Sequence, residues 1–227
     1  MDILRQIRDA NPTSQLPSLW LDSEDPYTQW EGVTWNAENI KVIELIVNST
    51  EITTLPQVNK LTSLQTLDCS SNQIASLDIS KLTNLQNLYC NSNQIATLNV
   101  TSLLKLKNLV CAANQLTTLD VNGLTSLQQI SCVDNRLTAL NVEGLSMLQY
   151  IACQYNQISE LNVSSLTILL ELSCEYNQLT TLDIEGLTNL QYLTCNSNKL
   201  LSIPTLTSKE LIIYYDFTYN NFPHALS

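Results

Sequence analysis

The stretch LDCSSNQIASLDISKLTNLQNLYCNSNQIATL, which runs from Leu67 to Leu98, contains the same pattern twice. Cys69 is followed by Cys90, and Asn72 by Asn93, each 21 residues later. The unit reads L-x-x-L-x-C-x-x-N-x-(L/I)-x-x-L-x-(V/I)-x-x-L-x-x. Six copies without insertions start at Leu64, Leu85, Leu106, Leu127, Leu148 and Leu169, and a seventh, one residue longer, starts at Leu190. The chain is therefore a repeat array.

The repeat unit itself predicts the architecture. In L-x-x-L-x-C the apolar positions alternate with polar ones, which is typical of a strand with one buried face. One copy has too little apolar surface to fold alone, so copies must stack as coils around a shared core, with their strands forming a parallel sheet. Because 21 residues leave little room for a helix, we expect short turns or 3-10 segments after each strand. A recurring Asp or Asn, such as Asp78 or Asn99, is expected to cap each turn.

The L-x-x-L-x-C-x-x-N-x-L core resembles that of leucine-rich-repeat proteins, with Cys in the third Leu position. The 21-residue Cys-containing unit is similar to that of bacterial surface arrays. This resemblance implies a solenoid with its parallel β-sheet on the concave side, short turns or 3-10 segments on the convex side, and a cap at each end. We expect an N-terminal cap at residues 1–41, about eight coils at 42–211, and a degenerate last repeat with a C-terminal cap at 212–227.

The segment before the first coil resembles the N-terminal cap of plant-type leucine-rich repeats. The matching residues are Asp25, Pro26, Trp30, Gly32 and Val33. Tyr27 and Trp35 stand where that cap has two cysteines, which implies a disulfide-free cap of the bacterial kind. Trp20, Trp30 and Trp35 are expected to cover the first coil. In the last repeat, Phe217 and Phe222, beside Tyr219 and its neighbours, are expected to plug the other end.

Two columns of repeated residues are interpreted as structural. Seven in-register cysteines project side by side, which disfavours disulfides, and one histidine with no C-x-x-C pair disfavours a zinc site. A free Cys behaves as a small buried hydrophobe, and a buried Asn can satisfy backbone groups of its own turn and of the next coil. The predicted structural core comprises Cys69, Cys90, Cys111, Cys132, Cys153, Cys174, Cys195, Asn72, Asn93, Asn114, Asn135, Asn156, Asn177 and Asn198.

Charge and hydropathy exclude several partners. The net charge is −11, and between Asn108 and Asn198 the only basic side chain is Arg136. Such a surface repels nucleic acids and anionic membranes. No apolar run of about 18 residues is present, so membrane insertion is not expected. The first residues, MDILRQIRDANP, do not form a signal peptide, although one could have been replaced in this chain.

Function is expected on the outward strand positions, where residues vary from copy to copy. Exposed tyrosines are frequent anchors of protein interfaces, and neighbouring carboxylates favour a protein or peptide ligand with basic residues. The predicted ligand-binding residues are Tyr150, Gln154, Tyr155, Glu171, Glu175, Tyr176 and Tyr192. A secondary apolar patch is predicted at Tyr89, Val110 and Val133. Scattered aromatics on strands could also reflect β-propensity alone.

The sequence leaves three functions open besides protein or peptide binding. Tyrosines among polar residues can also stack on sugars, so a glycan-binding, adhesin-like surface protein is the second hypothesis. An enzyme is a remote alternative, because no nucleophile–histidine set or Gly-rich phosphate loop occurs, and a calcium-binding module is equally remote. No cofactor or metal is expected, and the chain is expected to be a monomer. The resemblance implies secretion or a bacterial cell surface, whereas seven unpaired cysteines favour a reducing compartment.

Overall fold

The computed structural model describes residues 2–16, 30–38, 41–203 and 214–222. It divides into two compact units, residues 1–115 and 116–227, which are described separately. Tyr27 lies outside the described residues, as do Trp20, Asp25 and Pro26. The expected replacement of a disulfide by Tyr27 and Trp35 therefore stays a prediction.

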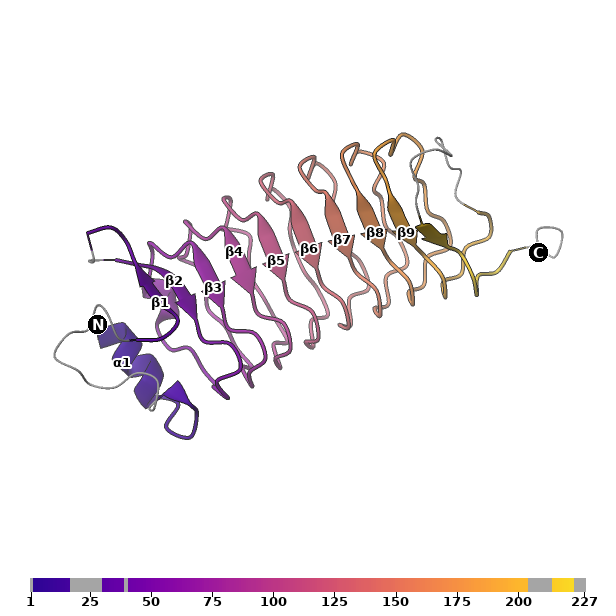
Figure 1. Cartoon of the computed structure of the whole chain (residues 1–227). Helices are drawn as coiled ribbons and strands as arrows, with labels where there is room; N and C mark the ends of the chain where they lie inside the picture. Colours follow the sequence, from indigo (N-terminus) through magenta and orange to yellow (C-terminus); the bar gives the residue numbers. More distant parts are fainter. Residues whose placement is uncertain (1, 17–29, 39–40, 204–213, 223–227) are drawn as a thin grey trace. The chain divides into compact units, whose positions relative to one another are not determined.

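The first unit contains a short helix followed by stacked coils (Figure 1). Strands β2 to β5 are parallel, with the 21-residue step appearing as the pairs Thr66↔Asn87 and Asn87↔Asn108. Strand β1 pairs antiparallel with β2, a pairing that the repeat pattern does not predict. The elements are α1 (Asp2–Asp9), β1 (Val33–Trp35), β2 (Val42–Ile46), η1 (Val58–Lys60), β3 (Thr66–Asp68), β4 (Asn87–Tyr89) and β5 (Asn108–Val110).

The second unit continues the same plan with parallel strands only among its described residues. Its strands are β6 (Gln129–Ser131), β7 (Tyr150–Ala152), β8 (Glu171–Ser173), β9 (Tyr192–Thr194) and β10 (Tyr214–Asp216). Tyr150 pairs with Glu171 and Glu171 with Tyr192, while Tyr192 pairs with Tyr214, 22 residues later, because the seventh copy is longer by one residue. Each unit is thus a solenoid of stacked coils with parallel strands, which confirms the predicted fold class.

Inward-facing residues make a dry core. The middle residue of each strand from β3 to β9 is buried, and all seven cysteines are free and 0% exposed. Burial raises the pKa of the Cys69, Cys132 and Cys195 thiols to about 12, since a thiolate would lose its hydration in the core. The pKa values of Cys90, Cys153 and Cys174 are also raised well above the ordinary value, mainly by burial.

The asparagine column links neighbouring coils. Asn177 is 3% exposed, and its Nδ2 donates to the carbonyl oxygens of Cys174 in its own coil (3.1 Å) and of Cys153 in the preceding coil (3.0 Å). Its Oδ1 accepts from the backbone N–H of Ile158 in the preceding coil at 2.9 Å. We expected contacts to the next coil. The amide instead bonds to the preceding coil. The Cys153 carbonyl oxygen, for example, accepts from Asn156 in its own coil and from Asn177 in the following coil.

In the copies that contain strands β3 to β8, the strand is followed by a short turn on the opposite side of the coil, and a side chain caps that turn. Within the described residues, η1 is the only 3-10 helix, and the other repeats use turns. In six copies an Asp or Asn Oδ1 accepts from the backbone N–H two residues later, as predicted from the recurring Asx. These residues are Asp78, Asn99, Asp120, Asn141, Asn162 and Asp183.

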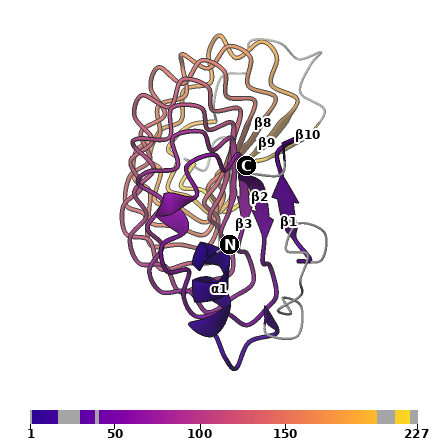
Figure 2. The same cartoon turned by 90° about the vertical axis from the view of Figure 1, so that its left-hand side faces the viewer.

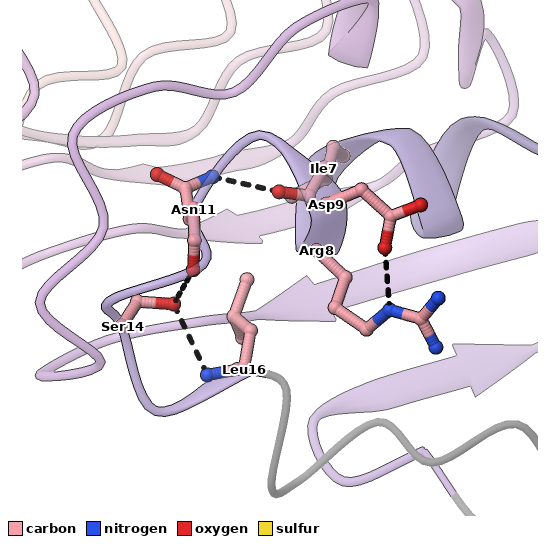
Figure 3. Close-up of polar contacts among 6 residues, drawn as sticks. All are labelled: Ile7, Arg8, Asp9, Asn11, Ser14 and Leu16. Carbon is pink, nitrogen blue, oxygen red and sulfur yellow. Dashed lines mark hydrogen bonds and ion pairs between the residues drawn. The ribbon is translucent and has the colours of Figure 1, made fainter.

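A helix covers the first coil, which the sequence analysis did not predict. Helix α1 lies beside η1 and buries Leu4 and Ile7 completely (Figure 2). Asn11, just after α1, donates to the carbonyl oxygens of Ile7 (2.7 Å) and Thr54 (2.9 Å), so it joins the helix to the coil. Figure 3 shows how Ser14 closes this loop by donating to the Asn11 carbonyl oxygen at 2.7 Å.

The expected aromatic covers are present only in part. Trp30 is buried, whereas Trp35 is half-buried. At the other end Phe217 and Phe222 are half-buried, but Tyr219 is 82% exposed and is not part of a plug. An aromatic residue at a chain end therefore does not by itself indicate a cap.

All seven thiols are expected to react slowly with a chromogenic disulfide reagent at pH 8 in the native protein and rapidly in guanidinium chloride. The thiolate is the reactive species, and burial removes both access and ionisation. Stopped-flow absorbance on the same sample with and without denaturant measures both rates. Fast labelling of several thiols in native protein would contradict the buried column.

Candidate ligand-binding surface

The outward side of the sheet in the second unit gathers the predicted ligand-binding residues. Strands β7, β8 and β9 place Tyr150, Glu171 and Tyr192 in register as direct neighbours. Tyr150 is 40% and Tyr192 38% exposed, while Glu171 between them is half-buried. We call the following set the tyrosine surface: Tyr150, Gln154, Tyr155, Glu171, Glu175, Tyr176 and Tyr192.

Two further tyrosines form a stacked pair just beyond β7 and β8. The ring centroids of Tyr155 and Tyr176 are 4.5 Å apart, and the ring planes differ by 10°. The side chains remain 51% and 46% exposed, so only part of each is covered by its partner. Partial burial, followed by the nearby Tyr176 and Glu175, raises the pKa of the Tyr155 hydroxyl above its ordinary value. The Tyr155 hydroxyl is therefore neutral at pH 7, and both rings are accessible.

Both stacked tyrosines have left-handed backbone conformations, with φ 56° at Tyr155 and 55° at Tyr176. The fold requires this conformation after every repeat strand. Bulky residues rarely adopt it. The same position is filled by small or acidic residues at Ser71, Ser92, Ala113, Asp134 and Ser197, and by a third tyrosine at Tyr219.

The two carboxylates are held by hydroxyl groups that the sequence analysis did not select. Thr194 donates to Glu175 Oε2 at 2.6 Å, and Ser173 donates a longer bond of 3.4 Å to Glu171 Oε1. Both hydroxyl residues are nearly buried, at 8% and 5% exposed. In the sequence, only their positions directly before Cys195 and Cys174 indicate that they lie on the strands beside these carboxylates.

Gln154 lies beside the pair but makes an incomplete set of contacts. Its Oε1 is buried and accepts no hydrogen bond from the residues that the structure describes.

The residues of the predicted secondary patch are divided between the two units. Tyr89 and Val110 are register partners on β4 and β5 of the first unit, and both are half-buried. Val133, also half-buried, follows β6 and belongs to the second unit. The tyrosine surface, in contrast, lies wholly within the second unit.

The described parts of the chain contain neither a metal-binding cluster nor a membrane-spanning helix. Within these parts, no group of three or more His, Cys, Asp or Glu side chains could hold a metal ion. None of the helices found there is long and apolar enough to cross a membrane.

Comparisons with known proteins find both a matching sequence family and similar solved structures. The sequence model described as Leucine Rich repeats (2 copies) matches residues 62–105. No curated protein matches the chain. The functional domain of InlJ from Listeria monocytogenes, described as including a cysteine ladder, is 35% identical with a TM-score of 0.64. That alignment covers 78% of this chain and 44% of the InlJ functional domain.

Two other solved structures extend the comparison. Internalin C2 of Listeria monocytogenes is 25% identical, with a TM-score of 0.69, 77% of this chain covered and 80% of that one. The ectodomain of the Arabidopsis receptor kinase HAESA, solved in complex with an IDA peptide hormone, is 23% identical with a TM-score of 0.82. The alignment covers 97% of this chain and 41% of the HAESA ectodomain. At 23% identity, the similarity shows the fold alone. The chain thus spans less than half the length of the InlJ functional domain and of the HAESA ectodomain.

The double substitution Tyr155→Asn/Tyr176→Asn is expected to change the free energy of unfolding by less than about 1 kcal/mol. Loss of the stacked pair costs about 0.5–1.5 kcal/mol, and relief of left-handed strain, which Asn tolerates, offsets it. Guanidinium chloride unfolding followed by circular dichroism measures the difference. A loss of about 3 kcal/mol or more would mean that the rings are structural.

Proposed function

Because the chain is a leucine-rich-repeat protein similar to a Listeria protein with a cysteine ladder, we propose that it is a non-catalytic module that binds a protein or peptide ligand. The tyrosine surface is the proposed binding site. The observation that carries this proposal is the gathering of four tyrosines, each 38–51% exposed, on three successive coils.

Exposed tyrosines suit recognition for a physical reason. A tyrosine buries a large area on binding while losing little conformational entropy, since it has only two side-chain torsions. Part of that cost is already met at Tyr155 and Tyr176, because each ring is held by the other at a centroid distance of 4.5 Å. A ligand would therefore meet a partly preorganised surface.

The left-handed positions of Tyr155 and Tyr176 strengthen the argument. A bulky side chain there brings no benefit to the backbone, and five other coils use serine, alanine or aspartate instead, while the last coil carries Tyr219. Strain kept at an exposed position supports a functional role. In this proposal the rings are retained for contact with a ligand.

Charge indicates the character of that ligand. Glu171 and Glu175 lie on the tyrosine surface, and between Asn108 and Asn198 the chain has Arg136 as its only basic residue. Such an excess of negative charge attracts a segment that carries Arg or Lys and repels acidic ones. The proposed partner is therefore a basic protein or peptide segment.

The setting of the protein is part of the same proposal. The HAESA structure shows that this fold can hold a peptide, and the similarity to Listeria internalins supports a secreted or cell-surface bacterial protein. Adhesion through glycans is the competing assignment, and the experiment below includes it.

The test is a selection of random peptides displayed on phage, panned on the full chain and then synthesised for affinity measurement by fluorescence polarisation. The expected peptides carry basic residues, and the Tyr155→Asn/Tyr176→Asn variant should weaken their binding by about tenfold or more. Loss of two well-placed aromatic contacts accounts for that factor.

Tyr219→Asn is the matched control, since it removes an exposed tyrosine from the same left-handed position outside the tyrosine surface. It should leave affinity unchanged. Peptides that bind both variants like the wild type, or acidic peptides only, would refute the proposal. Binding to a glycan array that the Tyr155→Asn/Tyr176→Asn variant loses, without any peptide binding, would favour the glycan assignment.

A further inference from the structure

We infer that the tyrosine surface recognises arginine in preference to lysine, by stacking a guanidinium group on the Tyr155–Tyr176 pair while Glu175 binds its edge. This inference rests on the proposed function and deepens it, because it names the ligand group that the surface would select.

The shape of the stacked pair favours a planar cation. The two rings are almost parallel, with an interplanar angle of 10°, and their exposed fractions of 51% and 46% leave ring surface open beyond the stack. A ring face is electronegative and attracts cations. A guanidinium is flat and weakly hydrated, so it can lie against such a face, whereas an ammonium is compact and strongly hydrated.

The carboxylate beside the pair is already oriented. Thr194, which is 8% exposed, donates to Glu175 Oε2 at 2.6 Å and so restricts the rotation of the carboxylate. No hydrogen bond from a described residue reaches the other oxygen, Oε1, which leaves it available to a ligand. Glu175 also directly precedes Tyr176 in the chain and acts electrostatically on Tyr155.

One guanidinium can make the two contacts with two different parts of the group, its face and its edge. An ammonium has no such face and edge. The guanidinium carries its N–H donors in the ring-like plane, so its face can stack while its edge donates to a carboxylate. Lysine must make both contacts through one ammonium nitrogen, so turning donors toward the ring face leaves fewer of them for the carboxylate. The combination of a stacked pair and an adjacent carboxylate therefore separates the two basic residues.

The test uses L-argininamide and L-lysinamide as probes, titrated into the full chain while the tyrosine ring signals are followed by NMR. Argininamide is expected to shift the Tyr155 and Tyr176 signals with a dissociation constant about twofold to fivefold lower than that of lysinamide, in line with a cation–π contact at an exposed site. The Tyr219 signals should not move.

Glu175→Gln is expected to remove most of this preference while keeping an acceptor for Thr194. Glu160→Gln is the matched control, because it makes the same charge change at an exposed residue outside the tyrosine surface. Equal affinities for the two probes, or a preference that survives Glu175→Gln unchanged, would overturn the inference.

The outcomes separate this inference from the proposed function. If selected peptides bind in a tyrosine-dependent way but tolerate Arg→Lys replacement, the arginine preference fails and the binding function stands. If no peptide binds through the tyrosines, the binding function fails, and the argininamide titration still decides whether the pair prefers a guanidinium.

Discussion

The structure depends on one hydrogen-bonding side chain, the repeated asparagine that follows each cysteine by three residues. Its amide joins a turn to its own coil and to the coil before it, as Asn177 does with Cys174 and Cys153. Buried backbone groups must be paired. Backbone bonds such as that from the Tyr155 N–H to the Glu175 carbonyl oxygen already link the coils, and the asparagine amide adds partners for the carbonyl oxygens and the N–H group that it contacts. Together with the backbone bonds between neighbouring coils, this interaction holds the coils in register.

Because these buried contacts determine the coil, the outward side chains contribute little to the fold. Leucine, cysteine and asparagine fill the inside of every repeat, whereas the exposed positions carry residues as different as Asp134 and Tyr155 at equivalent places. Variation there costs little stability, so binding can be built by changing side chains on a constant frame. The tyrosine surface is an example, since its stacked pair occupies positions that the backbone alone would give to smaller residues.

Sequence periodicity predicted the parts of the fold that repeat. The alternation around Leu67 and Cys69 was enough to assign strands, stacking and a buried cysteine column, since each copy adds the same evidence. Features that occur once had no such support. Helix α1 is only eight residues long, and strand β1 pairs antiparallel, so neither could be separated from irregular cap sequence.

The sequence predicted which residues lie on the candidate surface but not how their side chains are arranged. Spacing placed Tyr150, Glu171 and Tyr192 on neighbouring strands, and the register of the strands follows that spacing. The stacking of Tyr155 on Tyr176 depends on side-chain torsions, and the backward reach of the asparagine depends on carbonyl direction. A one-dimensional pattern contains neither quantity.

The most direct test of the central role of asparagine is hydrogen exchange at the Ile158 amide in the wild type and in Asn177→Ala. In the wild type this amide donates to Asn177 Oδ1 at 2.9 Å, whereas the Leu137 amide donates to Asn156 and serves as an internal reference. Loss of the acceptor should cost about 1–3 kcal/mol, so exchange at Ile158 should accelerate by about fivefold or more while that at Leu137 changes less. Unchanged exchange at Ile158 would show that the coils hold together without the asparagine ladder.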